Sequence, residues 1–158
     1  MDKSRYPSDW DEISRRIRFD RAGGKCEWCG APNGKEIVRS SADPARYIVL
    51  DEETYGYTWP DGQPIRMSEI PDEYDILRGV RVILTVHHKG IPHEDGAPGD
   101  RHDKMDVREE NLAALCQRCH LYADLDIHIS NAKITRARKK REQAAKVGQL
   151  DLFAGGSE

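Results

Sequence analysis

Residues 110–120 read ENLAALCQRCH, and this stretch decides which fold the chain can adopt. It ends in the pair Cys116 and Cys119, and the other two cysteines of the chain form a matching pair, Cys26 and Cys29. A CxxC turn spaces two thiolates to share a metal, and two such turns complete a tetrahedral Cys₄ zinc site. The spacing predicts a structural Zn²⁺ that closes most of the chain into one loop. Disulfides or redox chemistry are the alternative.

Two apolar segments lie close to the second cysteine pair. Residues 111–116, NLAALC, form a short apolar run, and residues 80–88, VRVILTVHH, alternate as a β-strand does. One face of this predicted strand carries Val80, Val82, Leu84, Val86 and His88. His88 therefore ends the row that faces the core, His87 falls on the opposite face, and residues 111–116 are the expected packing partner.

The segment from residue 117 to residue 146 contains no Gly or Pro and predicts one long helix. Two stripes run along it at helical spacing. The first is apolar and predicts a core face: Leu121, Leu125, Ile129 and Ala132. The second carries groups that can bind a metal: His120, Asp124 and His128.

All six histidines lie between His87 and His128, and none occurs in the first 86 residues. Such a concentration predicts a metal site or a proton-transfer site. A polar loop that happens to contain histidine accounts equally for His93 and His102.

The N-terminal segment predicts a helix over residues 9–22. Ser8 and Asp11 resemble a capping box, the apolar residues at positions 10, 13 and 17 fall at helical spacing, and two glycines follow at positions 23 and 24. Four arginines lie largely off this apolar stripe, and either a solvated face or phosphate contact explains them: Arg15, Arg16, Arg18 and Arg21.

Residues 40–75 have a different composition, with nine acidic and two basic side chains. The stretch RYIVLDEETYGYTW within them predicts a β-hairpin or short strand pair. Since the whole chain has a net charge of -3, the remainder is net positive. We interpret this acidic segment as an insert in the fold.

The sequence TVHH at residues 85–88, the stretch ENLAALCQRCH and the upstream CEWC together resemble the HNH endonucleases, which are ββα-metal nucleases. The residues matching the family name are His88, Asn111 and His120. The resemblance implies an α+β fold: a zinc-bound ββα core with an N-terminal helix, an inserted acidic β-hairpin and a long basic C-terminal helix.

The same resemblance implies roles for the matched residues. His88 is expected to be the general base, and Asn111 either orients His88 or gives an oxygen to the metal. His120 is expected to bind a catalytic divalent ion, with His87 as a second ligand. Asp124 stands where some members of the family use a histidine, and an oxygen ligand there favours Mg²⁺ or Mn²⁺.

Residues 133–146, KITRARKKREQAAK, hold seven basic residues and one acidic residue. This charge density predicts contact with the DNA backbone, chiefly through Arg136, Arg138, Lys139, Lys140 and Arg141. The alternative is a solvated helix end whose cations favour the helix dipole.

Residues 147–158 predict a flexible tail, because Gly148 ends the helix and two further glycines follow at positions 155 and 156. Its sequence QLDLF resembles the pentapeptide that binds the bacterial sliding clamp. The resemblance implies polar contacts from Gln149 and an apolar anchor formed by Leu152 and Phe153. Alternatively, Leu150, Leu152 and Phe153 cover an apolar patch of the same chain.

A length of 158 residues favours one folded domain, here residues 1–146 before the tail. The chain contains no run of 18 apolar residues, and residues 1–10 lack a signal peptide, so we expect no membrane contact and a cytoplasmic location. Two functions remain: a metal-dependent DNA endonuclease or nickase, bacterial or phage-encoded, and a catalytically silent zinc module that binds DNA or a protein.

Overall fold

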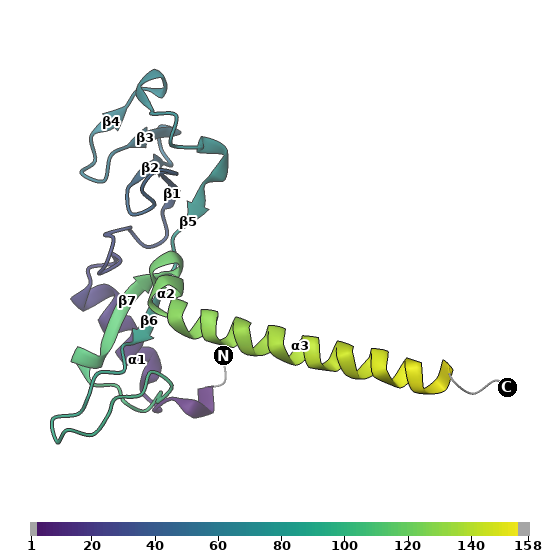
Figure 1. The fold of residues 1–158 in the computed structure, drawn as a ribbon. Helices are drawn as coiled ribbons and strands as arrows, with labels where there is room; N and C mark the ends of the chain where they lie inside the picture. Colours follow the sequence, from purple (N-terminus) through teal and green to yellow (C-terminus); the bar gives the residue numbers. More distant parts are fainter. Residues whose placement is uncertain (1–2, 155–158) are drawn as a thin grey trace. The chain divides into compact units, whose positions relative to one another are not determined.

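The computed structural model describes residues 3–154, with side chains for residues 4–146. The chain divides into two compact units, Met1–His120 and Leu121–Glu158. The first unit combines short helices with antiparallel strands, and the second is dominated by one helix (Figure 1). The predicted mixed α+β class is therefore confirmed.

The N-terminal helix consists of α1 (Trp10–Arg15), which continues directly into a π-helical turn, η2 (Arg16–Arg21); a 3₁₀ turn, η1 (Lys3–Arg5), precedes it. The predicted helix over residues 9–22 is thus confirmed, and its apolar stripe is buried. The predicted capping box is wrong. Asp9 is the N-cap and its side chain caps nothing; instead, the backbone N–H of Trp10 bonds to the carbonyl of Pro7.

The predicted strand over residues 80–88 is interrupted. It forms β5 (Val80–Arg81) and β6 (Leu84–His88), which belong to different sheets. Between them, Val82 bonds through its N–H to Lys35 and through its carbonyl to Gly34, and the N–H of Ile83 bonds to the Gln117 side chain. Since these bonds redirect the backbone, one alternating sequence serves two sheets.

Strand β6 pairs antiparallel with β7 (Leu112–Cys116), which follows the 3₁₀ turn η5 (Glu109–Asn111). This confirms the predicted partner of the second half of the strand. The helix α2 (Gln117–Ala123) begins directly after β7. One face of the strand pair packs against the N-terminal helix in a core of Trp10, Ile13, Ile17, Leu112 and Ala114.

The acidic insert is larger than the hairpin predicted at residues 40–75. It forms a five-stranded antiparallel sheet in the order β4-β3-β2-β1-β5. The remaining strands are β1 (Glu36–Arg39), β2 (Tyr47–Asp51), β3 (Gly56–Thr58) and β4 (Pro64–Ile65), with 3₁₀ turns η3 (Met67–Glu69) and η4 (Ile76–Arg78). The predicted pair is β2 with β3, and Val38, Ile48, Ile65 and Tyr74 form a separate small core.

The second unit is built on α3 (Leu125–Ala154). The apolar stripe predicted along this helix is not a core face, because Leu121, Leu125 and Ile129 are exposed. The helix also passes through Gly148, so the prediction that it ends there is wrong. A glycine inside a helix costs only about 1 kcal/mol relative to alanine, which does not force an end. The side chains of Gln149–Phe153 lie outside the described residues.

No helix in the described part of the chain is long and apolar enough to cross a membrane.

Candidate metal centres

The two CxxC pairs come together as predicted. The sulfur atoms of Cys26, Cys29, Cys116 and Cys119 all lie within 4.8 Å of one another, and those of Cys29 and Cys116 are 3.7 Å apart. Four sulfurs around a zinc with Zn–S bonds of about 2.3 Å are about 3.8 Å apart in a tetrahedron. The four residues are therefore positioned to bind a metal ion, and the spacing fits zinc.

Local hydrogen bonds explain how pairs so distant in the sequence meet. The first CxxC turn closes with a bond of 2.8 Å from the N–H of Gly30 to the carbonyl of Cys26. Gly30 has φ +74°, a left-handed backbone conformation that residues with a side chain rarely adopt. Glu27 then forms two hydrogen bonds with Ala114 of β7. Its N–H donates to the carbonyl of Ala114 at 2.9 Å, and its carboxylate accepts from the N–H of Ala114 at 2.7 Å. The turn is thereby held against the strand that leads into the second pair.

The protonation of the thiols also favours a bound cation. Burial raises the pKa of Cys119 to about 12, and hydrogen bonds with Cys26 and Cys29 raise the pKa of Cys116. Hydrogen bonds with Cys116 and Cys26 lower the pKa of Cys29. Without an ion, deprotonation is therefore favoured at Cys29 and disfavoured at Cys116 and Cys119. Thiolates held this close repel one another, and a divalent ion offsets that repulsion.

A cationic side chain from the insert lies against these sulfurs. Arg39 of β1 approaches the sulfur of Cys116 at 3.4 Å and that of Cys29 at 3.7 Å, and it donates to the carbonyl of Pro44 at 2.9 Å. Sequence reasoning missed Arg39, because nothing in the local sequence ties residue 39 to residue 116.

A second group of potential ligands forms where β6 meets α2. The rings of His87 and His120 are 4.9 Å apart between centroids and nearly perpendicular, at 76°. Asp124 lies four residues after His120, in the turn that separates α2 from α3 and interrupts the single helix predicted for residues 117–146. The ligand atoms of His87, His120 and Asp124 lie within 4.8 Å of one another. His87 is buried, whereas the other two are partly exposed. The three residues that the sequence analysis named as ligands of a catalytic ion are thus brought together.

Thr85 fixes the orientation of one imidazole in this group. Its hydroxyl lies 2.7 Å from Nδ1 of His120 and 3.4 Å from the carbonyl of Leu115. If the hydroxyl hydrogen goes to Leu115, the oxygen accepts from Nδ1–H, and Nε2 of His120 keeps its lone pair for a metal. Sequence reasoning missed Thr85, although its position two residues before His87 on the same strand face was an available signal.

Asn111 is fully buried, and its side chain forms hydrogen bonds with backbone groups. Its side-chain oxygen accepts bonds from the N–H groups of Gly90 at 2.8 Å and Ile91 at 3.1 Å, and its side-chain nitrogen donates to the carbonyl of Asp106. Both lone pairs of the oxygen are therefore engaged. Of the two roles that the resemblance left open, this geometry favours positioning of the chain that follows His88.

His88 lies on the other face of β6 from His87, as the strand alternation predicted. Its ring stacks on Trp10 at 5.5 Å and 20°, and neither ring nitrogen has a hydrogen-bond partner among the described residues. Burial, and then the charge of Lys104, lower the pKa of His88, so the ring stays neutral near pH 7.

The remaining candidates are spread over the surface. His93 approaches the buried carboxylate of Asp106 at 3.8 Å, and His102 and His128 are exposed. Among the N-terminal arginines, ion pairs within the unit engage Arg15, Arg16 and Arg21. The basic residues predicted to bind DNA are exposed on α3: Arg136, Arg138, Lys139, Lys140 and Arg141.

Comparison of the chain with protein-family models, with curated proteins and with solved structures found no match in any of the three. The function of this chain is therefore inferred from its sequence motifs and from the geometry of its residues.

Proposed function

We propose that this chain is a metal-dependent DNA endonuclease or nickase of the HNH type, with zinc as its structural ion. The observation that carries the proposal is the group formed by His87, His120 and Asp124 at the junction of an antiparallel strand pair with a helix. Two imidazoles and one carboxylate leave coordination positions open for a substrate, whereas four thiolates do not.

The residues of the group suit phosphodiester hydrolysis. His87, His120 and Asp124 would hold a divalent ion, Mg²⁺ or Mn²⁺, which would stabilise the negative charge that develops on the phosphate. In the reaction, a water oxygen bonds to phosphorus, the water proton goes to a general base, and the bond to the leaving sugar oxygen breaks. His88 is the proposed base, as the resemblance to the HNH nucleases implies, and its ring is neutral. Both ring nitrogens are buried beside Trp10 on the face of β6 opposite His87, so the role requires that water and substrate reach that face.

Asn111 supports this role as a positioning residue. By binding the N–H groups of Gly90 and Ile91, it fixes the chain within three residues of His88. Gly90 has φ +69°, and a side chain at this position would meet Arg101. The turn after β6 is thus rigidly defined, as a catalytic histidine at the end of a strand requires.

The second unit supplies the proposed contact with the DNA backbone. Its basic residues over 133–146 are exposed, and Glu142 is the only acidic residue in this segment. Binding through phosphate contacts weakens steeply with salt. Replacing Arg138, Lys139 and Arg141 by Glu should therefore reduce affinity for all DNA sequences alike and flatten the salt dependence. Salt-independent binding would exclude this surface.

The motif QLDLF at residues 149–153 is the proposed attachment to a bacterial sliding clamp. Such an attachment would raise the local concentration of a bacterial or phage-encoded nuclease on replicating DNA. The test is titration of purified clamp against a labelled peptide of residues 146–158 and against the whole protein. Replacing Leu152 and Phe153 by Ala should abolish binding and leave nicking without clamp unchanged.

The nuclease proposal is tested with supercoiled plasmid incubated with Mg²⁺, Mn²⁺ or no added metal. His88→Ala should reduce nicking by about 10²- to 10⁴-fold, the usual cost of losing a positioned base. His102→Ala, in an exposed loop, is the matched control and should nick as wild type does. His88→Ala with full activity would move the base to another residue, and His87→Ala is then the next variant.

The alternative is a catalytically silent zinc module with the same fold. It predicts zinc binding and salt-dependent DNA binding without any nicking by the wild-type protein. The plasmid assay therefore separates the two functions directly.

A further inference from the structure

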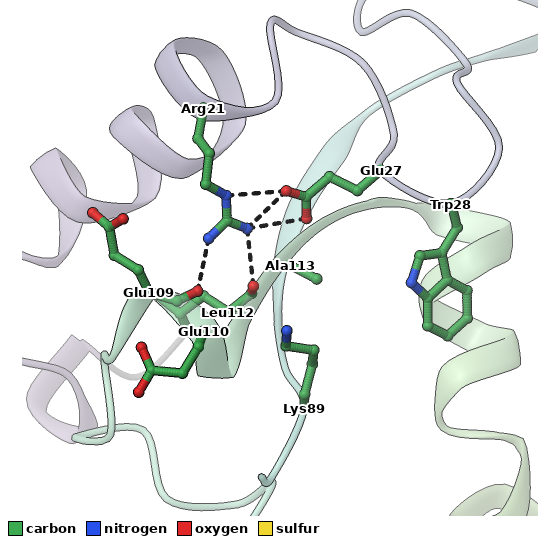
Figure 2. Close-up of a pocket in the computed structure, with 8 residues that line it drawn as sticks. All are labelled: Arg21, Glu27, Trp28, Lys89, Glu109, Glu110, Leu112 and Ala113. Carbon is green, nitrogen blue, oxygen red and sulfur yellow. Dashed lines mark hydrogen bonds and ion pairs between the residues drawn. The ribbon is translucent and has the colours of Figure 1, made fainter.

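A cleft of about 410 Å³ lies in the first unit, and none of the roles described above uses it. Figure 2 shows Arg21 and Glu27 joined on one side of the cleft and Trp28 and Lys89 on another. Trp28 stands within the first CxxC turn and is 52% exposed. An exposed indole beside a cleft of this size offers a flat apolar surface to a ligand.

The cleft opens on the same face of the β6–β7 pair as His87. Ala113, which lines the cleft, is the direct register partner of His87. Directly opposed residues of an antiparallel pair point to the same face, with Cβ atoms about 4.5–5.5 Å apart. Lys89 lies two residues after His87 and also lines the cleft. His87 and His120 do not themselves line the cleft, but a group bound against Ala113 lies one strand away from His87 on the same face.

The charges of the cleft select what can enter it. Arg21 is engaged by both carboxylate oxygens of Glu27 and by the carbonyls of Glu109 and Leu112. Each carboxylate that lines the cleft is paired with an arginine: Glu27 with Arg21, Glu109 with Arg16 and Glu110 with Arg108. The cleft therefore carries little uncompensated charge inside, which suits a neutral aromatic ring, and Lys89 adds a cation that suits a phosphate at the rim.

We propose that the cleft binds an unpaired nucleobase of the DNA strand whose phosphate lies at the His87–His120 pair. The base stacks on Trp28, and Lys89 contacts the neighbouring phosphate at the rim. This inference rests on the proposed function and names its substrate class. A base within a duplex is covered by its neighbours on both sides, so the substrate is single-stranded or locally unpaired DNA.

The test measures binding of labelled single-stranded and duplex oligonucleotides of one sequence to the full chain, without added divalent ions. Trp28→Ala should weaken single-strand binding by about 5- to 150-fold, which corresponds to one stacked base. Duplex affinity should change much less. Trp28→Phe, which keeps an aromatic ring, should retain most of the single-strand affinity. Tyr55→Ala, at an aromatic residue 84% exposed on the insert, is the matched control.

Trp28 lies between Cys26 and Cys29, so the zinc content of each variant is measured first. Trp28→Phe provides a second readout that does not depend on the alanine variant. Single-stranded DNA should quench tryptophan fluorescence in the wild type, and most of this quenching should disappear in Trp28→Phe while binding persists. Persistent quenching would overturn the proposal.

Equal single-strand affinity of wild type and folded Trp28→Ala would also overturn it, as would an equal loss for single strands and duplex. A wild-type protein that never nicks plasmid, yet shows the Trp28 effect on single strands alone, would refute the nuclease proposal and leave the base-binding cleft standing. The two failures are thus distinguishable.

Discussion

The cysteine group and the histidine–aspartate group contain adjacent residues, Cys119 and His120, yet they differ in ligand type, number of ligands and burial. The cysteine group is closed, consists of four sulfur atoms and is largely buried. The histidine group has only three ligand residues, two of them partly exposed. Soft thiolates retain zinc, whereas imidazole and carboxylate ligands exchange harder ions and leave positions open.

We propose that the two groups, which meet at neighbouring residues of α2, have different roles, one structural and one catalytic. The first group holds the ends of a long loop together, and the second uses the resulting rigid junction to present ligands. If this is correct, damage to the cysteine group should destroy both groups, whereas damage to the histidine group should leave the cysteine group intact.

The largest effect is expected for Cys26→Ala. Structural zinc contributes about 10–16 kcal/mol in apparent binding free energy, and a domain has a net stability of only about 5–15 kcal/mol. The variant should therefore lose zinc and unfold or aggregate. Elemental analysis and circular dichroism measure both properties. A folded Cys26→Ala protein without zinc would show that the group does not hold the fold together.

His120→Ala should have a more selective effect. It removes one ligand of the second group, so binding of Mn²⁺ should weaken by more than the roughly 10- to 100-fold cost of losing a supporting residue. Zinc content and the unfolding transition should stay close to wild type, and high Mn²⁺ should partly restore nicking. Calorimetric titration with Mn²⁺ measures the affinity. Loss of zinc in this variant would contradict the division between the two groups.

Thr85→Val should weaken the second group without removing a ligand. The hydroxyl that orients Nδ1 of His120 is lost while the side-chain shape is kept. We expect Mn²⁺ affinity to fall by about 10- to 100-fold. Thr85→Ser keeps the hydroxyl and should bind as wild type does, measured by the same titration. Equal affinity of Thr85→Val and wild type would show that His120 needs no such support.

The sequence predicted features that follow from local spacing. The CxxC turns and the spacing of His120 and Asp124 depend on residues a few positions apart, and the pairing of β6 with β7 was predicted from two apolar segments, each recognisable by itself. The break after β5 was not predictable, because it depends on bonds from Val82 to Lys35 and Gly34, which alternation does not encode.

In the second unit, a feature that the sequence did predict is absent from the structure. Helical spacing predicted a core stripe over Leu121, Leu125 and Ile129, but periodicity alone does not specify what covers a helix face. Arg39 and Trp28 were missed because their importance comes from the partners that the fold brings to them. The sequence therefore indicates the ligands of the two groups better than the residues that support them.

The smallest effect is expected at Arg39, which tests how the insert contributes to the cysteine group. Its guanidinium lies 3.4 Å from the sulfur of Cys116, where it would offset part of the negative charge of four thiolates that bind a zinc ion. A net hydrogen bond contributes about 0.5–1.5 kcal/mol, so Arg39→Met should speed zinc release by about 2- to 10-fold. Release to a chromogenic chelator measures the rate. Arg46→Met, which removes an exposed arginine paired with Glu73 in the same insert, is the control and should release zinc as wild type does. Since the insert has its own small core, the fold should persist in both variants. Equal release rates for Arg39→Met and wild type would mean that the insert packs beside the cysteine group without stabilising its charge.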